Sequence, residues 1–339
     1  RMSDPAILQH LAAPRTALRA RRVGFLLAAL AIIALPLIFN DTYWRTNLTI
    51  CAINVLLALG LDFILGYTGQ LNLGHSAFYG LGAYVSTLLI VKLGVPFWVA
   101  FVAGVAFSGL AGMFLSLFAV RLRGHYLAIA SLGFAVIIYQ ILLNWISLTQ
   151  GPLGIYGIPP PPALTIAGIQ LADFRNLTAF FYLVSGFTFL VYLLLSQLVR
   201  SPVGETLTAI REDEVSAASL GINGAAWKVF AFGIGAAVGG AAGCFYASFV
   251  GTLVPDAFFV TEAFNILAMV IVGGMGTLIG PVFGAILLTL LPEVLRGIGD
   301  LRLVVYGAAL TFVVLFMPGG LAQAARIVQE KLRFGGPGS

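Results

Sequence analysis

Three ionisable side chains lie in or beside long apolar runs of this sequence, where an ionisable group marks a candidate functional site. Asp62 and Glu293 lie within about two helical turns of the ends of their runs, so we expect both to extend to the membrane interface. His75 has no carboxylate beside it at metal or relay spacing, which favours a hydrogen-bonded structural histidine over a proton relay.

The other candidate motifs point away from catalysis. Glu212-Asp213-Glu214 spreads around a helix with no histidine nearby, whereas an intramembrane enzyme needs clustered acid–base or metal ligands. Gly273–Gly276 lacks the Lys and Ser/Thr that hold phosphate and magnesium in a nucleotide-binding loop. Cys51 and Cys244 lie inside apolar runs, so we expect two small buried hydrophobes. The sequence predicts no enzyme, metal site or cofactor site in this chain.

The composition indicates a membrane protein. Of 339 residues, 60% are hydrophobic and 9% are charged, with a mean hydropathy of +1.02. A typical soluble domain has roughly 25% charged residues. The apolar runs are continuous and long enough to cross a bilayer as helices, which excludes a transmembrane β-barrel and a disordered chain.

These runs predict an all-α polytopic transmembrane bundle of about ten spans. Eight or nine spans remain open, because Gly273–Gly284 fits a re-entrant element as well as a turn. With the N-terminus inside, most of the 18 Lys and Arg residues fall in inside segments, so both termini are expected to be cytoplasmic. The expected spans are Val23–Phe39, Leu48–Gly66, Phe78–Val91, Phe97–Val120, Tyr126–Ile146, Leu177–Val199, Val229–Val250, Ala263–Leu278, Pro281–Leu295 and Leu303–Met317.

This arrangement divides the chain into three parts. They are a cytoplasmic segment 1–22, a transmembrane domain 23–317 with an inside segment 200–228 and an external loop 147–176, and a cytoplasmic tail 318–339. The external loop contains the run Pro159–Pro162, which favours a rigid extended path.

The inside segment predicts an amphipathic helix. Ser201 and Pro202 form an N-cap and first-turn signal, and a helix of about 18 residues follows, up to Gly221. Its opposite face is acidic and would be repelled by anionic lipid, so we expect the helix to dock into a groove of another protein rather than lie on the membrane. The docking stripe combines Leu207, Ile210, Glu214, Ala218 and Gly221, with Arg211 at its edge.

Four stretches resemble the LivM-type permeases of branched-chain amino-acid ABC importers. They are Gly69–Phe78, Arg121–Ile129, Arg211–Asn223 and Gly273–Pro281, so the resemblance covers roughly residues 45–320. It implies a permease subunit in the bacterial inner membrane that translocates branched-chain or related hydrophobic amino acids. Related permeases serve urea, short amides and aromatic acids, which leaves the substrate open. One departure is that two residues rather than three separate Ala217-Ala218 from Gly221, unlike the coupling signature of ABC importers at large.

The resemblance also implies partners. They are a second homologous permease, two cytoplasmic ATPase subunits that bind ATP and Mg, a periplasmic binding protein and membrane lipid, with no nucleic acid. The implied ATPase-coupling residues are Leu207, Ile210, Arg211, Glu212, Glu214, Ala217, Ala218 and Gly221. A self-sufficient secondary transporter is the alternative, but it normally needs charged groups in mid-span, and these are scarce here.

Polar residues after the second span predict a broken element beside the translocation pathway. Non-helical backbone at membrane depth is tolerated where protein buries it or water surrounds it. The candidate pathway residues are Asn72, Gly74, His75 and Ser76, and an ordinary inside loop is the alternative. We expect three polar side chains within spans to hydrogen-bond between helices, namely Asn54, Asn144 and Asn265.

Overall fold

The computed structural model describes residues 41–119, 122, 125–166 and 169–299, with isolated positions at 32, 34–36, 301, 304, 305, 307, 308, 311 and 320. The chain divides into two compact units, residues 1–46 and 47–339, and every contact discussed below lies within the second. Most of the predicted first and tenth spans, segment 1–22, most of 318–339 and most of the segment 120–124 lie outside the described residues.

Within the described part of the chain, eight helical segments are long and apolar enough to cross a membrane. They match the predicted second to ninth spans, so the all-α polytopic class is confirmed, whereas the total span number and the positions of the termini stay predictions. The helices are α3 (Thr42–Thr68), α4 (His75–Leu93), α5 (Phe97–Ala119), α6 (His125–Asn144), α8 (Leu177–Val199), α11 (Gly224–Val250), α12 (Val260–Gly273), which follows the 3-10 turn η2 (Pro255–Phe258), and α13 (Ile279–Val294), which continues into η3 (Leu295–Ile298).

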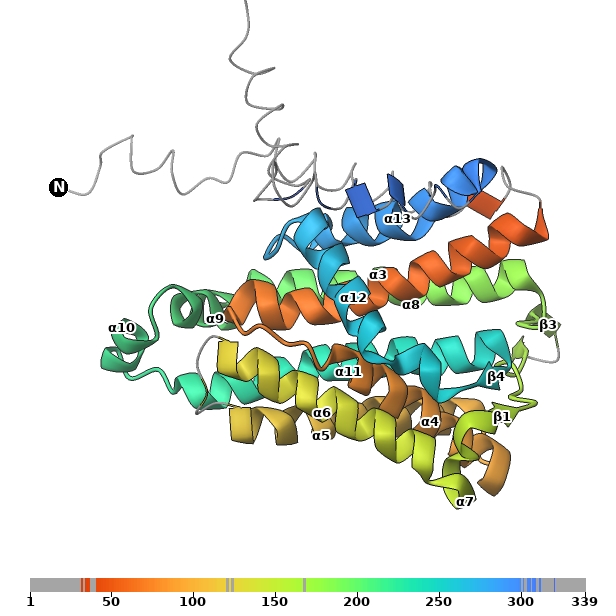
Figure 1. The fold of residues 1–339 in the computed structure, drawn as a ribbon, viewed down its shortest axis with the longest axis horizontal. Coiled ribbons are helices and arrows are strands. Elements are labelled where there is room, and N and C mark those ends of the chain that lie inside the picture. Colours follow the sequence, from red (N-terminus) through yellow and green to blue (C-terminus); the bar gives the residue numbers. More distant parts are fainter. Residues whose placement is uncertain are drawn as a thin grey trace, which may run out of the picture. The chain divides into compact units, whose positions relative to one another are not determined.

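Close helix approach builds the core of this bundle. Helices α4, α5 and α11 lie side by side (Figure 1). A Cβ atom on Gly82 of α4 would overlap the backbone of Gly240 in α11, and one on Gly104 of α5 would lie 2.8 Å from Cys244 Sγ. Cys51 and Cys244 are both buried free thiols, as the sequence predicts. The helices can therefore approach closely because small residues line their contacts.

Short helices and strands gather at the two ends of the long helices. Helices α9 (Pro202–Glu212) and α10 (Glu214–Ser219) lie at one end, and β1, β3 and β4 lie at the other (Figure 1). The predicted external loop contains α7 (Ile146–Thr149), η1 (Gly151–Leu153), β1 (Ile155–Tyr156), β2 (Leu164–Ile166) and β3 (Ile169–Ala172). Strand β1 pairs with β4 (Thr252–Leu253), and β2 pairs with β3, both antiparallel. The sequence did not predict these four strands.

Candidate functional site

The predicted continuous inside helix is broken in two at Asp213. This residue has an extended backbone (φ −154°, ψ 105°) that ends α9 and begins α10. Its Oδ1 accepts hydrogen bonds from the Val215 and Ser216 amides at 2.9 and 3.2 Å, and its Oδ2 accepts one from Ser216 Oγ at 2.6 Å. The single helix of about 18 residues is therefore wrong, because aspartate is a strong N-cap and starts a new helix here.

The hydrogen bonds to Asp213 also determine the pH range over which its carboxylate stabilises the start of α10. The Ser216 hydroxyl, followed by the backbone amides of Ser216 and Val215, lowers the pKa of the Asp213 carboxyl below its usual value. A lowered folded-state pKa stabilises the cap above the ordinary aspartate pKa, and this stabilisation is lost as the pH falls through the lowered value. The cap is therefore fully ionised near neutral pH.

The predicted docking stripe faces the chain's own core. Leu207 is 0% exposed, Ile210 is 3% exposed and Ala217 is also buried. The expectation that this stripe docks into another protein is thus wrong for Leu207 and Ile210, because helices of the same chain already cover them, and they cover Ala217 of the candidate coupling set as well. The exposed members of that set are Arg211, Glu212, Ala218 and Gly221.

The docking stripe predicted from the sequence did not include two exposed apolar side chains at α10. Leu220 is 81% exposed and Val215 is 66% exposed. The prediction assumed one continuous helix with a regular 3.6-residue period. The break at Asp213 interrupts that period, so the prediction placed the wrong residues of α10 on the exposed face. The sequence does carry a signal for this break, because an aspartate followed by Glu and Ser is typical of the N-terminus of a new helix.

Arg211 reaches from α9 to the end of α3. Its guanidinium Nη1 donates a hydrogen bond to the Gly66 carbonyl oxygen. Its Cγ lies 3.2 Å from the position of a Cβ on Gly69, where φ is +70°. Arg211 is exposed beside the buried Leu207 and Ile210, and its guanidinium ties the inside segment to the last turn of α3.

Asp62 holds the loop between α12 and α13 from the other side. It is fully buried, and its two carboxylate oxygens accept hydrogen bonds from the Gly276 amide at 2.7 Å and the Leu278 amide at 3.2 Å. The expectation that Asp62 extends to the interface is therefore wrong, since protein covers it completely. Its carboxyl oxygens also lie at the N-terminus of α13, where the free backbone amides and the helix dipole favour an acceptor.

The two groups meet at one loop. Arg211 Nη1 lies 2.8 Å from the position of a Cβ on Gly276, the same residue whose amide bonds to Asp62. Residues 274–278 form the turn here, because α12 ends at Gly273 and α13 begins at Ile279, while the total number of spans stays a prediction. Residues of three of the four family-like stretches thus converge at one place, which we call the Arg211–Asp62 node and define by Asp62, Gly66, Gly69, Arg211 and Gly276.

Glu214 belongs to an internal ion pair rather than to a docking face. Its Oε1 lies 2.7 Å from Lys228 Nζ, and the Lys228 side chain is only 9% exposed. This pair fastens α10 to the first turns of α11. Removing Glu214 would leave the buried Lys228 ammonium without its partner, whereas Glu214 itself is partly exposed.

The predicted broken element lies between α3 and α4. Residues 69–74 are non-helical, and Asn72 Oδ1 accepts a hydrogen bond from the Gly74 amide at 2.8 Å. The Leu73 amide donates to Ser131 Oγ of α6 at 3.0 Å. This element is buried against α6, so it is more than an ordinary solvated loop.

His75 begins α4 and is 0% exposed. Its Nε2 lies 3.1 Å from the position of a Cβ on Gly60 and 3.0 Å from that on Gly239, so the ring fills a slot between α3 and α11. Neither ring nitrogen has a hydrogen-bond partner of ordinary geometry among the described residues, although the Leu57 backbone lies close to the ring. Because that backbone lies beside the ring, the expectation of a hydrogen-bonded structural histidine stays a prediction. Among the described residues, Asn72 Nδ2 and Ser76 Oγ are also buried without a hydrogen-bond partner.

The other polar candidates have separate surroundings. Asn54 Nδ2 donates to Thr289 Oγ1 of α13 at 3.0 Å, which confirms an interhelical bond. Asn144 bonds to Gln140, and Asn265 to Glu262, each within its own helix, so these two expectations are wrong. Glu293 lies half-buried near the end of α13, and its extension to the interface stays a prediction.

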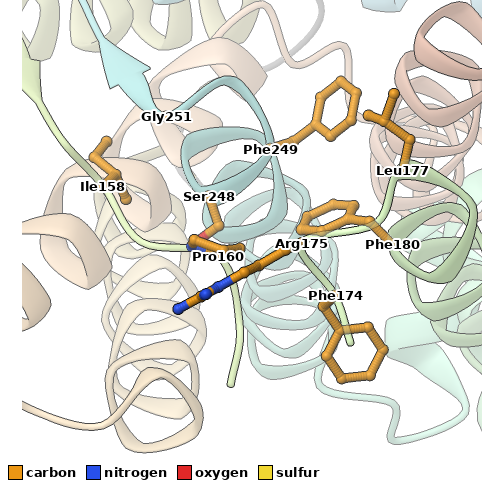
Figure 2. Close-up of a pocket in the computed structure, with 9 residues that line it drawn as sticks. All are labelled: Ile158, Pro160, Phe174, Arg175, Leu177, Phe180, Ser248, Phe249 and Gly251. Atoms are coloured by element: carbon orange, nitrogen blue, oxygen red, sulfur yellow. The ribbon is translucent and has the colours of Figure 1, made fainter. Parts of the chain in front are cut away.

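A pocket of about 250 Å³ lies at the opposite end of the bundle, where α8 begins and α11 ends. Figure 2 shows Arg175 extending beneath Pro160 and Ser248, while Leu177, Phe180 and Phe249 form the other side. The sequence did not single out this pocket, because its lining comes from three segments far apart in the chain.

Comparison with known proteins identifies the family. Residues 45–315 match the family described as branched-chain amino acid transport system / permease component. The chain is 34% identical to the high-affinity branched-chain amino acid transport system permease protein LivM of Escherichia coli, over 91% of this chain and 77% of that protein. It is 27% identical to the LivH permease of the same organism, over 81% of this chain and 92% of LivH. No solved structure matches.

Proposed function

Because the chain belongs to the permease component family of branched-chain amino acid transport systems, we propose that it carries branched-chain amino acids across a bacterial inner membrane. Like its relatives, it is a multi-pass transport subunit of an ABC transporter and not an enzyme. The proposed assembly contains a second related permease, two ATPases that bind ATP and Mg, and a periplasmic binding protein. The relatives do not favour urea, short amides, aromatic acids or ion-driven transport.

The Arg211–Asp62 node is the observation that carries this proposal. In an ABC importer, ATP binding moves a cytoplasmic segment, and the movement must reach the helices that line the pathway. Arg211 belongs to the segment that resembles the coupling region, and it bonds directly to α3 and borders the α12–α13 loop. Such a linkage can convert movement of α9 into tilting of α3 and α13.

We assign the ATPase contact to the exposed face of α10. Val215 and Leu220 are large, exposed apolar residues in a segment outside the candidate spans, beside the exposed acidic groups Glu212 and Asp213. Isolated exposed apolar residues are common, but here Val215 and Leu220 flank Ala218 at a helix held in place by the Glu214–Lys228 pair. This combination suits docking into a groove.

We expect Leu220→Glu to abolish transport without unfolding the permease. The change adds a desolvated charge to the interface while touching no span. The complete transporter, reconstituted with its binding protein, should lose substrate-stimulated ATP hydrolysis by tenfold or more, about 1.4 kcal/mol. Leu220→Met keeps the apolar contact and should retain most of the activity. Stimulation by leucine at the wild-type level in Leu220→Glu would show that α10 does not dock.

The proposed topology places α9 and α10 in the cytoplasm and loop 147–176 outside. We expect Pro162→Cys to react with an impermeant maleimide on intact spheroplasts and Ser219→Cys to react only after lysis, in a background lacking Cys51 and Cys244. Both positions are exposed, so access alone decides the labelling. The reverse pattern would invert the model of the membrane orientation.

We also propose that the broken element and His75 border the translocation pathway. Buried polar atoms without protein partners are rare and imply contact with water or ligand in some state. We expect Ser76→Ala to reduce uptake roughly threefold at unchanged melting temperature, because its hydroxyl satisfies no protein group. Ser116→Ala on α5 is the matched control for the lost hydroxyl, since Ser116 is equally buried and has no partner among the described residues but lies outside the broken element, so only position distinguishes the two variants. Equal uptake by both variants would contradict the pathway role.

A further inference from the structure

We propose that the pocket between the start of α8 and the end of α11 is an entry site that binds the zwitterionic backbone and apolar side chain of the transported amino acid. The inference rests on the proposed function and its topology, which place this pocket on the external side. It names a binding site in the permease itself, separate from that of the binding protein.

The polar side of the pocket carries two groups without protein partners. The Arg175 guanidinium makes no ion pair or side-chain hydrogen bond with the residues that the structure describes, although its backbone amide bonds to Asp173. Ser248 is only 5% exposed, yet its hydroxyl likewise makes no hydrogen bond within the described ranges. Both side chains line the pocket, and Figure 2 shows them close to Pro160. An unpaired guanidinium is suited to bind a carboxylate with two parallel hydrogen bonds.

The opposite side of the pocket is apolar and rigid. Phe180 is buried, and its ring centre lies 5.3 Å from that of Phe249. Leu177 and Ile158 complete the apolar lining. An aliphatic side chain can lie against these rings with little loss of side-chain entropy in the protein.

The helix ends add a matching polarity. The N-terminus of α8 lies beside Arg175 and carries partial positive charge, while the C-terminus of α11 beyond Ser248 carries partial negative charge. A ligand with a carboxylate and an ammonium group is therefore matched at both ends. Half-helix ends serve transporter substrates in the same way.

The size of the pocket limits the ligand. A volume of about 250 Å³ corresponds to roughly eight water molecules at about 30 Å³ each. This space is sufficient for a single small amino acid. A contact between Arg175 and the acidic surface of a binding protein is the competing explanation for an unpaired external arginine.

The test uses the complete transporter in lipid nanodiscs without its binding protein and measures retention of radiolabelled L-leucine. We expect Arg175→Gln to weaken retention at least tenfold, Ser248→Ala to weaken it about threefold, and Arg175→Lys to fall between wild type and Arg175→Gln. Leucinamide, which lacks the carboxylate, should compete poorly with leucine on the wild type, and this preference should disappear in Arg175→Gln. Lys92→Gln, another exposed basic residue of the proposed external side, should bind leucine like the wild type.

Several results would overturn the site. They are wild-type retention in Arg175→Gln, an unchanged preference for leucine over leucinamide, or no retention by a wild type that takes up leucine. If Arg175→Gln retains leucine normally but needs more binding protein for half-maximal ATP hydrolysis, Arg175 is a docking residue instead. Failure of the proposed function has a different signature, because the wild type would then show no leucine uptake with any loaded binding protein.

Discussion

Arg211→Ala is expected to uncouple ATP hydrolysis from transport while leaving the transporter assembled. The variant removes the hydrogen bond to the Gly66 carbonyl and the contact with Gly69, so α9 loses its connection to α3. Leucine uptake per ATP hydrolysed should fall at least tenfold, about 1.4 kcal/mol of lost coupling. The measurement is uptake and phosphate release in the same proteoliposomes.

Two further variants separate coupling from folding. Arg211→Lys keeps the charge but loses the planar fork, so it should retain part of the coupling. Glu205→Gln changes an exposed charge on the same helix and should behave like the wild type. If Arg211→Ala transports as many leucine molecules per ATP as the wild type, the node does not transmit the movement.

Asp62→Asn tests the other half of the node. The amide group can replace one acceptor but presents an N–H donor to the Gly276 or Leu278 amide, leaving a buried donor unpaired at a cost of about 1–3 kcal/mol. Because Arg211 and Asp62 act on the same loop, the double variant should lose less than the two single losses added together. Additive losses would show that the two residues serve separate tasks.

The sequence predicted the spans well because a long apolar run leaves a helix no alternative in a bilayer. It predicted the contacts of single polar residues poorly. The distance of Asp62 from a predicted helix end says nothing about a loop more than two hundred residues later that covers it. The pocket around Arg175 and Ser248 has the same origin, since its lining exists only after α8 and α11 are placed side by side.

The inside segment shows a different limit. The apolar residues Leu207 and Ile210 were recognised, but periodicity cannot tell whether an apolar stripe faces the same chain or a partner. The capping signal at Asp213 is present in the sequence. Treating α10 as a separate helix from that residue onward predicts that Val215 and Leu220 are exposed. A local capping signal is therefore a better guide in this segment than the periodicity of apolar residues over its whole length.

Gly243→Ala is expected to prevent stable packing of α4 against α11. A Cβ atom at position 243 would overlap the Tyr79 carbonyl oxygen and lie 2.8 Å from the Ala83 amide nitrogen. Both are backbone atoms of a regular helix, so neither can move away without separating the two helices. Overpacking of this kind costs typically about 1–3 kcal/mol and occasionally more. Loss of monodispersity and a lower melting temperature after solubilisation are the measurements.

The same substitution elsewhere should have the opposite effect. Gly186 of α8 has no atom within 4 Å of its Cβ position, so Gly186→Ala gains helix propensity of about 1 kcal/mol without a clash. Gly239→Ala should be intermediate, because it meets the His75 side chain at 3.0 Å and a side chain can shift. If Gly243→Ala and Gly186→Ala melt alike, close backbone approach does not hold α4 and α11 together. We expect the melting temperature to be lowest where the new Cβ atom meets backbone atoms (Gly243→Ala), higher where it meets a side chain (Gly239→Ala) and highest where it meets open space (Gly186→Ala).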